Sequence, residues 1–194
     1  MSFELSVNTG DVVRATKSEG PGLRYAIWVQ GCPLRCAGCC NPHLLEFKEA
    51  QRISVDDLLK DILAQEGLEG VTFVGGEPFS QALALGELCA RLKDAGLNTM
   101  AFSGFTLEEL TQDERNIKFL DNLDVLVDGP FMADLPEVKR RWIGSANQRI
   151  HYLTEVLKDR FEMTGNSVEL KMKGFEISIH GYPLKFLTKE LRKR

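Results

Sequence analysis

Four of the five cysteines in this 194-residue chain lie within nine residues, and no other feature constrains the fold as strongly. The segment reads Cys32-Pro33-Leu34-Arg35-Cys36-Ala37-Gly38-Cys39-Cys40. A tightly spaced set with an odd total is a poor framework for disulfides. The cluster instead predicts a loop that wraps around a metal centre.

The spacing Cys-x3-Cys-x2-Cys places the thiols of Cys32, Cys36 and Cys39 around one object. A four-iron cluster normally takes four cysteines, so three would leave one iron open to a small bidentate ligand. Zinc is an alternative, with Cys40 or His43 as fourth ligand. A ferredoxin-type cluster with Cys40 as fourth ligand is another, and spacing alone leaves both open.

Apolar segments typical of strands alternate with amphipathic segments typical of helices. Strands are expected at Leu23–Gln30, Val71–Val74, Asn98–Phe102 and Leu123–Val127. Helices are expected after Ser54, over Ser80–Ala95 and after Thr106. This alternation predicts βα units and a parallel sheet in a single domain.

Capping signals support the predicted helices. Asp57 follows Ser54 by three residues and Glu109 follows Thr106 by three, as in a capping box. The fifth cysteine, Cys89, falls on the apolar face of the second helix, so we expect it to be a core residue.

Polar and glycine-rich turns follow the predicted strands. They are the cysteine loop, Gly75-Gly76-Glu77-Pro78, Ser103-Gly104 and Asp128-Gly129-Pro130. Sites in parallel sheets gather beyond the carboxyl ends of the strands, so these turns should meet at one edge. The Gly-Gly pair leaves its backbone accessible and Glu77 adds a carboxylate, a combination that suits an ammonium group. Alone this motif could be a tight βα turn, but a zinc site has no need of it.

The cysteine loop together with Gly75-Gly76-Glu77-Pro78 resembles the radical S-adenosylmethionine superfamily. Further stretches narrow the likeness: Glu19–Arg24, Phe102–Leu110, Val127–Phe131 and Gly144–Arg149. The whole set, over about residues 19–150, is similar to the activating enzymes of anaerobic ribonucleotide reductases.

The resemblance implies an oxidoreductase with an α/β fold, a partial (β/α) barrel of the radical S-adenosylmethionine type. It implies one [4Fe-4S] cluster and S-adenosylmethionine, which is cleaved to a 5′-deoxyadenosyl radical. That radical would generate a glycyl radical on a partner reductase, and a flavodoxin or ferredoxin would supply the electron. Alternatives are an enzyme of the same build that acts on another protein, peptide or small molecule, and a non-catalytic metal-binding module.

The resemblance also implies roles for individual residues. The cluster ligands would be Cys32, Cys36 and Cys39, with Cys40 as a neighbour. The S-adenosylmethionine contacts would be Gly38, Cys39, Cys40, Gly75, Gly76, Glu77, Ser103 and Asp128, the Gly-Gly-Glu group holding the methionine amine. Asn147 and Arg149 are further signature residues, and Arg149 would bind the cofactor carboxylate, the partner's loop or a surface carboxylate.

Three positions depart from the pattern of these relatives. Leu34-Arg35 stands where histidine is frequent, Cys40 stands where an aromatic residue or histidine is usual, and Ile143 replaces a basic residue. These departures do not affect the expected radical chemistry, but they bear on the identity of the partner protein.

After residue 150 the pattern changes, and residues 151–194 are expected to form an extension. Val168–Ile179 predicts a hairpin around Lys173-Gly174, and Pro183 begins a predicted final helix that ends in Arg192-Lys193-Arg194. Cations at a helix C-terminus favour the macrodipole, with docking of a partner as the alternative.

Composition excludes several other classes. The net charge of −4 gives no basic footprint for nucleic acid, and neither Gly-x-Gly-x-x-Gly nor a Gly-Lys-Ser/Thr loop is present. The first residues do not resemble a signal peptide, and no apolar run could span a bilayer. The expected location is cytoplasmic, without nucleic-acid or membrane partners.

Overall fold

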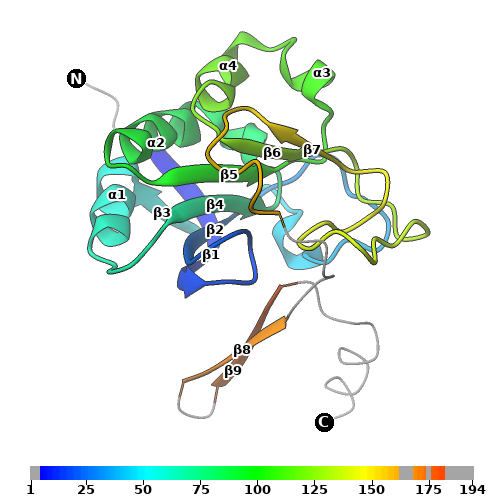
Figure 1. Cartoon of the computed structure of the whole chain (residues 1–194), viewed down its shortest axis with the longest axis horizontal. Helices are drawn as coiled ribbons and strands as arrows, with labels where there is room; N and C mark the ends of the chain where they lie inside the picture. The colour runs from blue at the N-terminus through cyan, green and yellow to red at the C-terminus, as the bar shows by residue number, and fades with distance from the viewer. Residues whose placement is uncertain (1–4, 162–167, 174–175, 182–194) are drawn as a thin grey trace.

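The computed structural model describes residues 5–161, 168–173 and 176–181 (Figure 1). The final helix expected from Pro183, its basic end and the hairpin turn at residues 174–175 lie outside these ranges.

A sheet of seven strands, in the order β3-β1-β2-β4-β5-β6-β7, forms the framework. Its central strands are β2 (Arg24–Val29), β4 (Gly70–Gly75), β5 (Asn98–Phe102) and β6 (Val125–Asp128). These four run parallel to one another and match the four expected strands within one or two residues. The α/β class with a parallel centre is therefore confirmed, and the sheet is open, with β3 and β7 at its edges.

Antiparallel strands, which the sequence did not predict, extend the parallel centre of the sheet at both edges. Three further strands, β1 (Ser6–Thr16), β3 (Gln51–Ser54) and β7 (Arg149–Tyr152), pair antiparallel with their neighbours. The register of β1 against β2 shifts twice, at Thr9/Asp11 and at Val13/Thr16. Such bulges break the period-2 alternation by which a strand is read from sequence.

Helices pack on one face of the sheet. They are α1 (Val55–Leu63), α2 (Ala82–Asp94), the short α3 (Leu107–Leu110) and α4 (Glu114–Leu120), of which α4 was not expected. Ser54 Oγ accepts from the amide of Asp57 at 3.0 Å, and both bonds of the Thr106/Glu109 capping box are present. Cys89 is fully buried in this helix-side core, as expected.

Strand β2 divides its side chains between the two faces of the sheet. Tyr25, Ile27 and Val29 belong to the helix-side core, whereas Ala26 and Trp28 face the other side. On that side lies an antiparallel hairpin of β8 (Val168–Lys173) and β9 (Glu176–Gly181), drawn in orange tones below the sheet in Figure 1. The hairpin confirms the sequence prediction.

Within the described ranges, none of the helices is long and apolar enough to cross a lipid bilayer.

Candidate functional site

A cavity of about 380 Å³ lies where the carboxyl ends of the parallel strands meet the cysteine loop. The loop contributes Cys32, Cys36, Cys39 and Cys40, and the strand ends contribute Gly75, Gly76, Glu77, Ser103, Gly104 and Gly129. The expectation that these four turns meet at one edge is confirmed. Segments about a hundred residues apart along the chain thus border one space.

The cysteine loop is closed at its neck by backbone hydrogen bonds. Gly31 donates to Leu44 O at 2.8 Å and Cys32 donates to Leu45 O at 3.1 Å. Further along, the Cys39 amide donates to Cys36 O at 3.2 Å, which forms a tight turn. The loop therefore projects its thiols from a fixed base.

All four thiols of the loop are free. Cys32 is buried, Cys36 and Cys39 are partly exposed, and Cys40 is exposed. Burial raises the pKa of the Cys32 thiol, and a bound metal would favour its ionised form. Among the residues that the structure describes, no three His, Cys, Asp or Glu side chains stand close enough together to hold a single ion.

The Gly75-Gly76-Glu77 turn packs directly on the base of the cysteine loop. The Gly76 amide donates to Val29 O and the Glu77 amide donates to Gly31 O, both at 2.8 Å. A Cβ atom on Gly76 would lie 2.3 Å from Gly31 O, and Gly75 has a φ of 109°. Only glycine fits this approach. Soft thiol donors beside an accessible glycine backbone suit an iron–sulfur cluster with a small ligand.

Glu77 joins two strand ends through one carboxylate. Its Oε1 accepts from the Phe79 amide and from Ser103 Oγ, each at 3.0 Å, and its Oε2 accepts from the Gly104 amide at 2.9 Å. Burial raises the pKa of Glu77 to about 7 despite these donors. A cation in the cavity would stabilise the ionised form.

Ser103 is fixed between its neighbours. Its amide donates to Val127 O at 2.8 Å, and its Oγ accepts from the Phe105 amide at 3.0 Å while donating to Glu77. Ser103 and Glu77 therefore form one unit at the cavity wall.

Two of the expected cofactor contacts do not border the cavity. Gly38 lies in the cysteine loop, with a φ of 75°, but is not among the lining residues. The Asp128 side chain is fully buried beside α3, where it accepts from the Leu107 amide at 2.6 Å and from Arg149 Nε at 3.0 Å. Burial alone would raise the pKa of Asp128, but the hydrogen bonds from Arg149 and Leu107 outweigh it and hold the pKa below its usual value.

Arg149 is engaged in ion pairs. Its Nη2 lies 2.5 Å from Asp128 and 2.6 Å from Glu108, and His151 Nε2 lies 3.0 Å from Asp128. Of the three expected roles, the contacts agree with the ion pair. Asn147 donates to Pro130 O at 2.7 Å and holds the loop after β6.

Arg24, from the Glu19–Arg24 stretch, stabilises the fold and does not line the cavity. Its fully buried guanidinium donates to Thr72 Oγ1, Pro21 O, Val71 O and Asn98 Oδ1, at distances of 2.5 to 3.0 Å. It fastens the turn before β2 to the amino ends of β4 and β5. Burial lowers its pKa to about 9.

The sequence did not identify several lining residues. They are Asp11, Glu19, Trp28, Trp142, Gln148 and His180. Glu19 and Gln148 fall inside the quoted signature stretches, a signal that could have found them. Burial raises the pKa of Glu19 to about 7, and its Oε1 accepts from the Gly181 amide at 2.8 Å.

The charged lining is acidic. Asp11, Glu19 and Glu77 border the cavity, and among the described residues no Lys or Arg does. The cavity therefore favours a cationic ligand over one that carries phosphate groups.

Comparisons with known proteins found a family model and several similar proteins. A family model described as a 4Fe-4S single cluster domain matches residues 18–151. The pyruvate formate-lyase-activating enzymes of Staphylococcus aureus strains USA300 and NCTC 8325 are each 41% identical over 87 residues, which is 42% of this chain and 35% of theirs. The chain thus matches about a third of the length of these relatives. The solved structure of QueE from Escherichia coli has a TM-score of 0.45 and 23% identity, over 52% of this chain and 53% of that one.

Proposed function

Because this chain belongs to the family of 4Fe-4S single cluster domains, we propose that Cys32, Cys36 and Cys39 each bind one iron of a [4Fe-4S] cluster. The fourth iron then binds S-adenosylmethionine. The observation that carries this proposal is that the three thiols and the Gly75–Glu77 turn border the same cavity.

Charge supports S-adenosylmethionine as the ligand. Its ammonium and carboxylate groups offset each other, its sulfonium leaves a net positive charge, and the cavity offers the carboxylates of Asp11, Glu19 and Glu77. The volume of about 380 Å³ lies within the range of small-molecule sites.

The residues of this chain bind and orient the cofactor. Glu77, together with the backbone of Gly75 and Gly76, receives the methionine amine, and Ser103 keeps the Glu77 carboxylate in place. Cys39 and Cys40 line the cofactor from the loop, and Gly38 gives that loop its left-handed turn. Asp128 acts indirectly, because it holds the start of α3 rather than the ligand.

The cluster and S-adenosylmethionine, when bound, supply an electron and a 5′-deoxyadenosyl radical that abstracts a hydrogen atom. The protein excludes water from this chemistry with apolar walls. Trp28, Phe102, Phe131 and Trp142 form these walls.

The proposed hydrogen donor is a glycine of a partner enzyme, which becomes a glycyl radical. The Staphylococcus aureus relatives are named as activating enzymes of pyruvate formate-lyase. The ordered stretches over about residues 19–150 favour an anaerobic ribonucleotide reductase as the target. Pyruvate formate-lyase is the second candidate, and a flavodoxin or ferredoxin is the proposed electron donor.

Anaerobic purification tests the proposal in two stages. The protein should contain four irons per chain and should form 5′-deoxyadenosine from S-adenosylmethionine under dithionite. Electron paramagnetic resonance should then detect a glycyl radical on the ribonucleotide reductase. A colourless zinc protein without 5′-deoxyadenosine would refute the enzyme, whereas a radical on pyruvate formate-lyase alone would change only the target.

A further inference from the structure

The β8–β9 hairpin reaches the cavity although it lies beyond residues 18–151, the segment that the family model matches. His180 and Gly181, at the end of β9, are lining residues. The hairpin lies on the face of the sheet opposite the helices (Figure 1). The cavity therefore has a wall that the cysteine loop and the strand ends do not supply.

Three contacts hold one end of the hairpin against β1, β2 and the segment between them. Thr16 Oγ1 donates to Glu169 at 2.5 Å, and the Gly181 amide donates to Glu19 Oε1 at 2.8 Å. The rings of Trp28 and His180 lie 5.9 Å apart at 50°. Because Glu169 and His180 are paired in register, all three contacts are at the same end of the hairpin.

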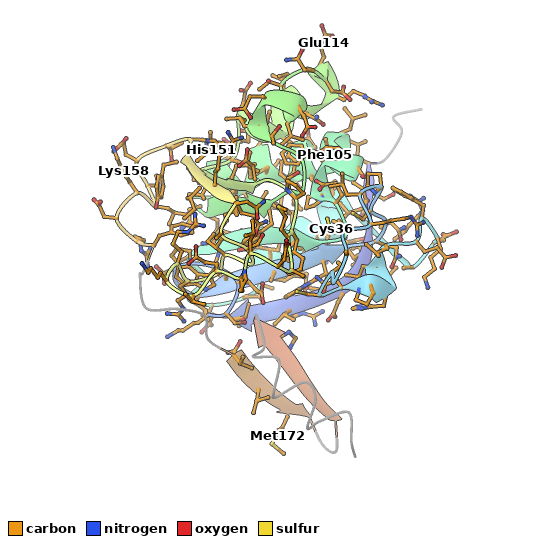
Figure 2. All side chains as sticks on the ribbon, turned by 90° about the vertical axis from the view of Figure 1, so that its right-hand side faces the viewer. Cys36, Phe105, Glu114, His151, Lys158 and Met172 are labelled. Carbon is orange, nitrogen blue, oxygen red and sulfur yellow. The ribbon has the colours of Figure 1, made fainter. Side chains whose placement is uncertain are left out.

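The described side chains farther along β8 are exposed to solvent. His180 is only 8% exposed, whereas Leu170 is 59% and Met172 is 75% exposed. Figure 2 shows Met172 on the projecting part, far from Cys36. The hairpin thus buries the end that borders the cavity and leaves its other end without described contacts to the sheet.

The hairpin and the cofactor residues approach the cavity from different directions. Glu77 and Ser103 extend from the carboxyl ends of β4 and β5. His180 instead lies against Trp28, whose side chain is on the face of the sheet opposite the helices. The hairpin therefore borders the cavity from a side that the strand ends do not occupy.

We propose that the β8–β9 hairpin is a wall of the subsite that receives the hydrogen donor, and that His180 contacts this donor. The inference rests on the proposed function, which places S-adenosylmethionine at the strand ends. In the step, a carbon–hydrogen bond of the donor breaks, the hydrogen atom joins the 5′ carbon, and the radical remains on the donor.

The chemistry of the walls indicates a polypeptide segment as the donor. Trp28 and Trp142 offer aromatic faces, His180 offers an imidazole, and the described lining has no Lys or Arg to bind phosphate. A glycine-containing loop without acidic side chains fits these surroundings. His180 is therefore a specificity-determining residue, separate from the cofactor contacts.

The test compares His180→Ala and His180→Leu with Met172→Ala, a matched control on the same hairpin. For each variant, the rate of glycyl radical formation is measured in two series. In the first series the concentration of anaerobic ribonucleotide reductase is varied, and in the second that of S-adenosylmethionine. The His180 variants should raise KM for the reductase about tenfold, as for loss of one well-packed contact, and change KM for S-adenosylmethionine much less. Met172→Ala should behave as wild type. Equal effects on both KM values, or no effect on either, would overturn the proposal.

A second measurement does not depend on the proposed function. In a Trp142→Phe background, which leaves Trp28 as the one tryptophan, acrylamide should quench the fluorescence of His180→Ala more strongly than that of Met172→Ala. Unchanged quenching would show that His180 does not cover Trp28 and would refute the proposal that the hairpin forms a wall of the subsite. Failure of the wild type to form 5′-deoxyadenosine would instead refute the proposed function, and quenching would still decide the position of the hairpin.

Discussion

Gly76→Ala should displace the base of the cysteine loop. The added Cβ would lie 2.3 Å from Gly31 O and 2.9 Å from Val29 O, whereas ordinary contacts of a Cβ begin at 3.4 Å. The turn and the loop must therefore separate by about 1 Å. Both contacts are with backbone, so no side chain can rotate away.

The structure sets the expected cost. Separation by this distance breaks the bonds from Gly76 to Val29 O and from Glu77 to Gly31 O, each worth about 1 kcal/mol net. Residual overpacking adds about 1–2 kcal/mol, so unfolding should require about 3–4 kcal/mol less free energy. Because Cys32 follows Gly31 directly, the same shift moves one proposed cluster ligand and should lower the iron content.

Gly67→Ala is the matched control. Gly67 has a φ of 72° and nothing within 4 Å of its ideal Cβ, so alanine there causes backbone strain of about 1 kcal/mol without a collision. Urea unfolding and the iron content of anaerobically reconstituted protein compare the two variants. If Gly76→Ala loses no more stability than Gly67→Ala and binds the same amount of iron, the steric argument is wrong.

Three further outcomes are expected. Cys36→Ala should lose the cluster and Cys40→Ala should keep it, as measured by iron content and visible absorbance; loss of iron in Cys40→Ala would make Cys40 a ligand. The Asp128 carboxylate, with a lowered folded pKa, stabilises the protein above its unfolded pKa of about 3.8, and this contribution is lost as pH falls through the folded pKa. The difference in unfolding free energy between wild type and Asp128→Asn should therefore stay constant at higher pH and shrink as the pH falls below about 3.8, and a difference that stays constant there would contradict this. S-adenosylhomocysteine, which lacks the sulfonium charge, should bind the reconstituted protein about tenfold more weakly than S-adenosylmethionine in a competition assay, and equal binding would argue against an electrostatic role of the acidic lining.

The central strands and the meeting of the turns were predictable because both depend on local patterns. An apolar run followed by glycine marks the end of a buried strand, and parallel strands bring their carboxyl ends together. Antiparallel β1 and β7 were not predictable in this way. β1 contains two register shifts, and the four-residue β7 alternates too briefly to be recognised.

The direction of a side chain at a strand end depends on register, which explains why Asp128 lies away from the cavity. Val125 and Val127 pack on the face of the sheet opposite the helices, and Leu126 packs in the helix-side core. By alternation Asp128 shares the side of Leu126, so its carboxylate reaches the start of α3 at Leu107. The rule that sites gather at the carboxyl ends of parallel strands predicts where Asp128 lies in the fold, but it does not predict the direction of its side chain. Contacts of the extension, such as that of His180, depend on how residues far apart in sequence pack, which no local pattern contains.

The acidic lining connects the proposed cluster with its ligand. Three thiolates around the irons would add negative charge to a cavity that already contains Asp11, Glu19 and Glu77, and burial raises the pKa of Glu19 and of Glu77 to about 7. The described lining contains no Lys or Arg to compensate this charge. The sulfonium of S-adenosylmethionine would bring positive charge into this acidic cavity. Cluster and cofactor binding should thus favour each other, since each reduces the electrostatic cost of the other.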